Sequence, residues 1–266
     1  MPTMRVDSHM HTSRCGHGAG VASEYLAHAE KTGIDVITFT EHVPLPQDLD
    51  PGREYAMPPE QWPDYIAEIR ALNSETVRIM LGAEADWLPG RMDHVNALLA
   101  VTEWDVVLGS VHMIEGWPFD DPELVSMWDG KDVDEVWRTY FQVFTDAARS
   151  GLFDVMAHPD LVKKFGHRPS ADPAPLYLEA ARILAAEGVA IEVSTAGLRK
   201  PCEELYPSDE FLSACAVEGV AVTTGSDAHC PEEVGLDLDA ALGALRRVGY
   251  REIVYFEKRQ PKTVSL

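Results

Sequence analysis

The sequence predicts an α/β fold in which parallel strands, each followed by a helix, close into a barrel. Short apolar runs rich in Val and Ile alternate with longer amphipathic stretches along all 266 residues. Seven or eight such units favour a closed barrel over a doubly wound sheet, because right-handed βαβ connections keep successive strands parallel. No GxGxxG or GxxxxGK(S/T) phosphate loop follows a strand, which argues against Rossmann and P-loop domains.

The expected strands are the β-branched runs. In chain order they are Met4–His9, Ile34–Thr40, Val77–Ala83, Asp105–Val111, Phe153–Ala157, Val189–Ser194 and Val220–Thr224, and a last run, Glu252–Phe256, closes the series. Nearly continuous apolar runs of this length are typical of strands buried on both faces in a parallel sheet.

The stretches between these strands predict helices. They are Ala22–Thr32, Pro59–Thr76, Met92–Val101, Val133–Ser150, Pro173–Glu187, Glu210–Val217 and Leu238–Val248. Several begin at a capping residue or a proline, and several stop at a glycine, as at Gly33, Gly151, Gly188, Gly219 and Gly249.

Two irregular segments interrupt the alternation. Pro44–Glu60 is rich in Pro, Asp and Gly and follows the second expected strand, so we expect a lid over an active site. Glu115–Asp132 carries Trp117 and Phe119. No internal repeat, low-complexity tract or linker divides the chain, so residues 1–266 are expected to form a single barrel domain.

The composition restricts the partners. There are 44 acidic and 22 basic side chains, a net charge of −22, which would repel nucleic acid and anionic membranes. No apolar run approaches the roughly 18 residues of a membrane span, and the start, Met-Pro-Thr-Met-Arg, lacks the apolar region of a secretory signal. The four cysteines form no CxxC pair and are typical of reduced thiols, so we expect a cytoplasmic protein. The sequence leaves the oligomeric state open.

The placement of the histidines predicts a metal site. Seven of the ten fall at or just beyond the carboxyl ends of expected strands: His9, His11, His17, His42, His112, His158 and His229. Glu84 and Asp227 lie at matching ends. In a β/α barrel these ends form one face, which holds the active site. His9 and His11 form a His-x-His, whose side chains leave a strand on the same side.

The ligand types restrict the metal. Imidazole and carboxylate together suit Zn, Mn and Fe. Nine candidates are too many for one ion, so two or three divalent ions are expected, with Glu84 bridging. Such a cluster would attract a phosphate dianion despite the acidic surface.

Together these residues resemble the PHP (polymerase and histidinol phosphatase) family. The segments HTSRCGH, TEHVPLP, GAEADWLPG, GSVHMIEGWPFD, DVMAHPDLVKKFG and STAGLRK look like its histidinol-phosphate phosphatase branch, and the resemblance runs from Asp7 to about His229. It implies a distorted (β/α)7 TIM-like barrel with the metal site at the C-terminal strand ends. It also implies hydrolysis of L-histidinol phosphate to L-histidinol and phosphate in histidine biosynthesis.

The resemblance further implies three metal positions. The first would be held by His9, His11, Glu84 and Asp227, the second by Glu84, His112 and His158, and the third by His17, His42 and His229. A metal-bridging hydroxide would attack phosphorus in line. Asp227, His229 or a metal-bound water would protonate the leaving alkoxide, so Asp227, His229 and the bridging Glu84 are the expected catalytic residues.

Positive side chains are the expected phosphate ligands. Arg199 follows the sixth strand and is the first candidate, because a guanidinium can grip two oxygens. Lys163, Lys164 and Arg53 are further candidates for substrate binding. The carboxylates of Asp7, Glu41 and Asp160 are expected to orient the ligating imidazoles. Trp117 and Phe119 would either flank a substrate imidazole ring or pack their loop.

Rival functions use the same residues differently. A PHP-family phosphoesterase acting on another small ester or a nucleotide is the first alternative, and a non-catalytic PHP-like accessory module of a polymerase is the second. An amidohydrolase barrel also starts with His-x-His but normally shows a bridging lysine at a strand end, and none of these strand ends carries one.

Overall fold

The computed structural model describes residues 4–266, so Met1–Thr3, part of the start that we expect to lack a leader, lie outside it. Seven parallel strands form one sheet in the order β1, β2, β3, β4, β7, β8, β9. Their bounds are Val6–Asp7, Val36–Phe39, Arg78–Asp86, Val106–Ser110, Val155–Met156, Ala190–Ser194 and Val222–Gly225. The amide of Ser8 donates to the carbonyl of Thr224 over 2.9 Å, which brings the first and last strands together. The predicted barrel is therefore confirmed, with seven strands and nearly closed.

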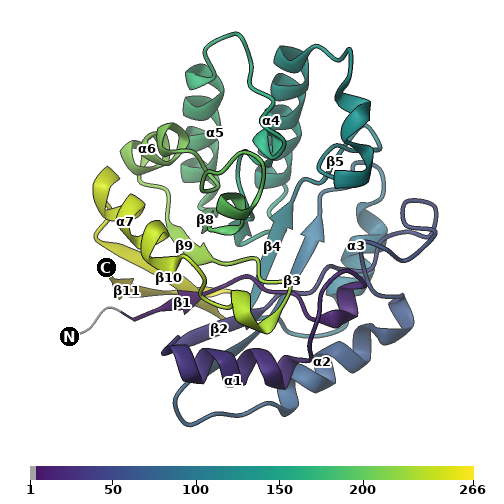
Figure 1. The fold of residues 1–266 in the computed structure, drawn as a ribbon, viewed down its shortest axis with the longest axis vertical. Helices are drawn as coiled ribbons and strands as arrows, with labels where there is room; N and C mark the ends of the chain where they lie inside the picture. Colours follow the sequence, from purple (N-terminus) through teal and green to yellow (C-terminus); the bar gives the residue numbers. More distant parts are fainter. Residues whose placement is uncertain (1–3) are drawn as a thin grey trace.

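Within residues 4–266, seven α-helices surround these strands (Figure 1). They are α1 (Ala22–Thr32), α2 (Trp62–Ala71), α3 (Met92–Leu99), α4 (Val133–Arg149), α5 (Ala174–Glu187), α6 (Asp209–Glu218) and α7 (Leu238–Val248). Only α2 ends well before its predicted end at Thr76. Leu72 is extended, and the hydroxyl of Ser74 accepts the amides of Thr76 and Val77, which turns the chain into β3.

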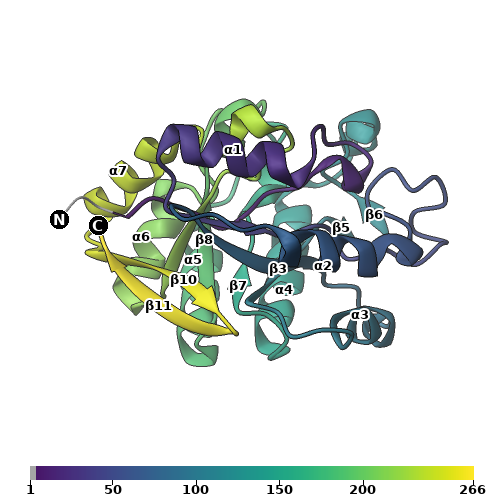
Figure 2. The same ribbon diagram turned by 90° about the horizontal axis from the view of Figure 1, so that it is seen from below.

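The last predicted strand is not part of the barrel. β10 (Glu252–Glu257) pairs antiparallel with β11 (Gln260–Ser265). Val254 and Phe256 pack in a cluster with apolar residues of β4, β7 and β8. At the tip of the hairpin, Arg259 bonds Asp154 at 2.9 Å, just before β7. Figure 2 shows the hairpin at the opposite end of the molecule from β5 (Met113–Ile114) and β6 (Trp117–Pro118).

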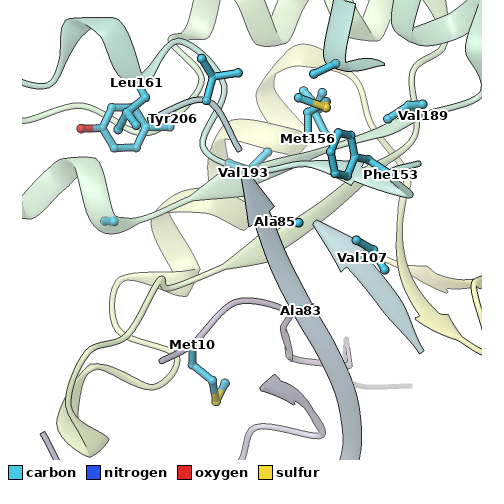
Figure 3. Close-up of a cluster of buried hydrophobic side chains, with 14 of the residues drawn as sticks. Met10, Ala83, Ala85, Val107, Phe153, Met156, Leu161, Val189, Val193 and Tyr206 are labelled. Carbon is cyan, nitrogen blue, oxygen red and sulfur yellow. The ribbon is translucent and has the colours of Figure 1, made fainter. Parts of the chain in front are cut away.

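The strands hold different side chains on their two faces, because successive side chains of a strand alternate. On β3, Glu84 lies between Ala83 and Ala85, two of the apolar residues drawn in Figure 3. On β4, any side chain at Gly109 would meet the ring of Phe153, so glycine is required there. The packed apolar face therefore holds Glu84 at a defined place on the other face.

Short 3-10 helices follow most of the strands. They are η1 (Ser13–Cys15), η2 (Pro59–Gln61), η3 (Pro122–Trp128), η4 (Leu161–Lys163), η5 (Ala196–Arg199) and η6 (Pro231–Glu233). Among residues 4–266, no helix is both long enough and apolar enough to cross a membrane.

Candidate metal centre

The nine predicted ligands lie together at the carboxyl ends of the strands. Seven of them line a cavity of about 700 Å³: His17, His42, Glu84, His112, His158, Asp227 and His229. His9 and His11 are fully buried and lie directly beside Glu84, each with Nε2 at 3.4 Å from its Oε2. A cavity of this size is typical of a small-molecule site.

Glu84 lies between two groups of imidazoles, and each of its carboxylate oxygens faces one group. Its Oε2 lies 2.8 Å from Nδ1 of His42 and 3.4 Å from Nε2 of His9 and of His11. Its Oε1 lies 2.8 Å from Nε2 of His158 and 3.7 Å from Nε2 of His112. One oxygen thus faces three imidazoles and the other faces two, the arrangement of a carboxylate that bridges two cations.

Three pairs of imidazole nitrogens face each other across short distances. Their Nε2 atoms are 2.9 Å apart in His9 and His11, 3.3 Å in His112 and His158, and 3.0 Å in His17 and His229. Two imidazole lone pairs at such a distance require a proton or a cation near both of them. These pairs coincide with three separate places at which an ion would find two nitrogen donors.

The other ring nitrogens explain why Nε2 is free to bind. Nδ1 contacts Glu192 at 3.0 Å in His9, Asp86 at 2.9 Å in His112, the carbonyl of Glu54 at 3.1 Å in His17, and the carbonyl of Asp227 at 3.0 Å in His229. A hydrogen bond donated from Nδ1 leaves the lone pair on Nε2, which is the tautomer that a metal ligand needs. The donor set therefore fits divalent ions.

The charges of the cluster compensate one another. Burial raises the pKa of Glu84, but His42 and His9 outweigh it and hold that pKa well below its usual value. Burial lowers the pKa of His112, but Asp86 and Glu84 raise it to about 10. Burial and neighbouring imidazoles lower the pKa of His17 to about 4. The metal-free centre thus holds protons on some imidazoles and leaves others neutral.

The carboxylates expected to orient imidazoles require correction. Asp7 bonds the amides of Ser226 and Gly235. Asp160 bonds Lys163 and the amide of Ser208. Both are fully buried, and no contact with an imidazole ring is found for either among the described residues. The Oε2 of Glu41 lies 4.0 Å from Nδ1 of His11, which is beyond hydrogen-bond distance.

Glu192 and Asp86 instead contact ligand imidazoles, and neither was predicted to do so from the sequence. A signal for both was present, because each lies in a strand that ends at the site. Asp86 is two residues beyond Glu84 and therefore on the same face of β3.

The candidate phosphate ligands differ in position. Arg199, Lys164 and Arg53 line the cavity. Arg199 donates to the carbonyl of Ser226 at 2.7 Å and remains 20% exposed, and Lys164 lies 3.0 Å from Asp120.

Lys163 does not line the cavity, contrary to expectation. It is completely buried, with Nζ at 2.9 Å from Asp160 and 2.7 Å from the carbonyl of Leu205. A short 3-10 helix turns it inward while Lys164 turns outward, a difference that two adjacent lysines do not reveal in sequence.

The two irregular segments meet beside the cavity, which Tyr55 and Asp121 both line. The hydroxyl of Tyr55 donates to Asp121 at 2.5 Å, which joins the segment 44–60 to the segment 115–132. Trp117 and Phe119 are buried and pack edge-to-face on Trp128. Neither ring lines the cavity, so of the two possibilities for these aromatic residues, packing of the loop is the one observed.

Comparisons with known proteins find a matching family model and similar curated phosphatases. A family model described as the PHP domain matches residues 7–196. A probable histidinol-phosphatase of Deinococcus radiodurans is 42% identical over 260 residues, which cover 96% of this chain and 98% of the relative. A histidinol-phosphatase of Bacillus subtilis is 28% identical over 263 residues, covering 89% and 97%.

A solved structure has the same fold. It is the histidinol phosphate phosphatase of Lactococcus lactis in complex with zinc, L-histidinol and phosphate. It superposes with a TM-score of 0.81 at 21% identity, over 97% of this chain and 98% of that one.

Proposed function

This chain belongs to the PHP domain family, and we propose that it is a metal-dependent phosphomonoesterase that hydrolyses L-histidinol phosphate to L-histidinol and phosphate. The convergence of seven histidines, Glu84 and Asp227 at one cavity carries the proposal. The relative at 42% identity, a probable histidinol-phosphatase that matches almost end to end, supports the substrate.

The three nitrogen pairs support a division of the ligands among two or three divalent ions, Zn, Mn or Fe. We assign His9, His11, Glu84 and Asp227 to the first position; Glu84, His112 and His158 to the second; and His17, His42 and His229 to the third. Nδ1 of His42 lies 2.8 Å from Oε2 of Glu84, which leaves Nε2 of His42 as its donor to the third position.

Ions bound there would polarise the phosphoryl oxygens and make a water molecule acidic near neutral pH. Arg199 is the proposed phosphate ligand, since its guanidinium lines the cavity and carries a fixed charge. Lys164 would add a second positive charge once it exchanges Asp120 for the phosphate. Arg53, in the segment 44–60, also lines the cavity and is a further proposed substrate-binding residue.

The proton transfers are assigned to Asp227 and His229. His9 and His11 hold the pKa of Asp227 well below its usual value against the effect of burial, so its carboxylate is ionised. An ionised carboxylate accepts a proton from the attacking water and returns it to the leaving alkoxide. Burial and His42 lower the pKa of His229, which keeps that ring neutral, so it would first accept a proton from water and then pass it to the leaving alkoxide.

The net charge and the free cysteines support a small-molecule substrate and a cytoplasmic location. The net charge of −22 disfavours nucleic acid and anionic membranes as partners. All four cysteines are free, as expected in a reducing compartment. The barrel draws its strands from Val6 to Gly225 and the hairpin packs on it, which supports one domain.

The proposal is tested with a panel of phosphate esters, comprising histidinol phosphate, other small phosphomonoesters, a nucleoside 3′-monophosphate and a phosphodiester. Each is assayed after loading with Zn, Mn or Fe. We expect the highest kcat/KM for histidinol phosphate and loss of turnover after chelation. A strong preference for another ester would contradict the substrate, and undiminished activity without metal would contradict the chemistry.

A further inference from the structure

Glu192 is a completely buried carboxylate with two different hydrogen-bond donors. It lies on β8, between β7 and β9 in the barrel. Its Oε1 lies 3.0 Å from Nδ1 of His9, and its Oε2 accepts the backbone amide of His158 at 2.7 Å. His9 and His158 belong to different proposed metal positions, so one side chain contacts a ligand of each.

The two contacts act in different ways. Through Nδ1 of His9, Glu192 sets the tautomer that frees Nε2 for a metal. His158 has no hydrogen-bond partner on Nδ1 among the described residues, so its ring is not oriented in that manner. Its backbone also has a positive φ of 26°, a strained conformation for a residue other than glycine. The bond from its amide to Glu192 therefore holds the backbone of His158, while Nε2 of the ring faces Glu84 at 2.8 Å.

The neighbouring strand leaves room for this carboxylate. A Cβ atom at Gly225 would overlap Oε1 of Glu192 and would lie 2.8 Å from Cβ of His9. Glycine at this position on β9 is thus required for Glu192 to reach both partners.

We infer that Glu192 is a positioning residue that couples the first and second metal positions and leaves the third, formed by His17, His42 and His229, independent. The inference rests on the proposed metal centre. It assigns to Glu192 the orientation of His9 and His158 from the side of the rings opposite to Glu84, through Nδ1 of His9 and the backbone amide of His158.

The substitution Glu192→Gln tests the coupling with almost no change in size. The carboxylate offers an acceptor to each of two donors, whereas an amide has one acceptor oxygen and an NH2 group. Oε2 of Glu192 also lies 3.1 Å from Nδ1 of His9, so whichever way the amide turns, its NH2 group faces a donor, either Nδ1 of His9 or the amide of His158, and one of the two positions loses its support. We expect metal affinity there to fall roughly 10- to 100-fold, the usual effect of losing an outer-sphere partner.

The readout is metal content and spectroscopy, in addition to activity. Wild-type protein and variants are loaded with Mn²⁺, dialysed, and analysed for metal per chain. Paramagnetic resonance then separates exchange-coupled Mn²⁺ pairs, expected at the Glu84-bridged positions, from an isolated ion at the third position. Glu192→Gln is expected to lose the coupled signal and keep the isolated one.

Two further variants sharpen the test. Gly225→Ala should reproduce the loss, because its Cβ would displace Glu192 and press on Cβ of His9, while the identity of every ligand is kept. Asp154→Asn removes a largely buried carboxylate next to the hairpin, at the other end of the barrel, and should keep the full metal content and the coupled signal.

The outcomes are distinguishable. Wild-type content and coupling in both Glu192→Gln and Gly225→Ala would overturn the inference and leave the proposed function standing. Equal loss of all three ions would overturn the independence of the third position. A wild-type protein that binds no metal would overturn both the inference and the proposed function.

Discussion

The Nε2 atoms of His17 and His229 lie 3.0 Å apart, although 212 residues separate them in the chain. His17 is only six residues beyond His11, yet it faces His229 and lies beside His42, with ring centroids 5.5 Å apart. The short helix η1 between His11 and His17 therefore carries the chain across the cluster. His11 also stacks on His42 and His229, with ring centroids 4.1 Å and 4.7 Å apart, so the assignment of His11 and His17 to separate metal positions stays a prediction.

Replacement of Glu84 by alanine should abolish most metal binding and turnover. Both of its oxygens face imidazoles, so its loss affects the first and second positions together. Loss of even an outer-sphere partner costs about 10- to 100-fold, and we expect a larger effect here. Metal analysis and kcat provide the measurement, with the exposed Glu135→Gln on α4 as the control. Near wild-type activity of Glu84→Ala would contradict the bridging role.

Replacement of Arg199 by glutamine should weaken substrate binding without loss of metal. A charge-assisted hydrogen bond contributes about 1.5–3 kcal/mol, so KM should rise roughly ten-fold or more. Equilibrium metal content and steady-state kinetics separate the two effects, and the exposed Arg149→Gln serves as the matched control. An unchanged KM would remove Arg199 from the phosphate site.

Metal binding should release protons at neutral pH and strengthen as the pH rises. Asp86 and Glu84 overcome the effect of burial and raise the pKa of His112 to about 10, so this ring is protonated in the metal-free centre at about pH 7. A ligand must lose that proton, so a higher pH favours the ion. Calorimetric titration in buffers of different ionisation enthalpy measures the number of protons released. A value of zero would show that His112 is not a ligand or is not protonated.

Replacement of Lys163 by methionine should destabilise the fold rather than impair substrate binding. The buried Asp160 would lose its cation, and breaking a buried pair in this way costs about 3–5 kcal/mol. Burial raises the pKa of Asp160 against the effect of Lys163, so the folded protein holds this proton more tightly than the unfolded chain does, and stability falls as the pH rises through that pKa. Urea unfolding of metal-free protein should show a smaller loss at about pH 5 than at about pH 8.

The kinetics of the same variant provide the contrast. The KM of the folded Lys163→Met enzyme should stay near the wild-type value, because Lys163 does not line the cavity. A large rise in KM with unchanged stability would return Lys163 to the substrate site.

The sequence by itself determined the barrel and the set of candidate ligands. Both follow from local periodicity: β-branched runs predict buried strands, and in parallel strands every carboxyl end lies on one face. His158 and Asp227 are far apart in the chain, yet each was recognisable because it directly follows a strand. The resemblance to the PHP family then predicted metal-dependent hydrolysis of a phosphate ester at this face.

Only the tertiary structure decided which neighbours support those ligands. Glu192 orients His9 and His158 because β8 packs between two other strands, a relation that no local pattern contains. Likewise, Lys163 and Lys164 differ by one position, but a single turn of helix buries one and directs the other to the cavity. The run 252–257 has the apolar pattern of a barrel strand, and it forms a hairpin because its partner, β11, is the next segment of the chain. Residue type and periodicity are local properties. The hydrogen-bond partners of a ligand and the burial of a side chain depend on which distant segments meet.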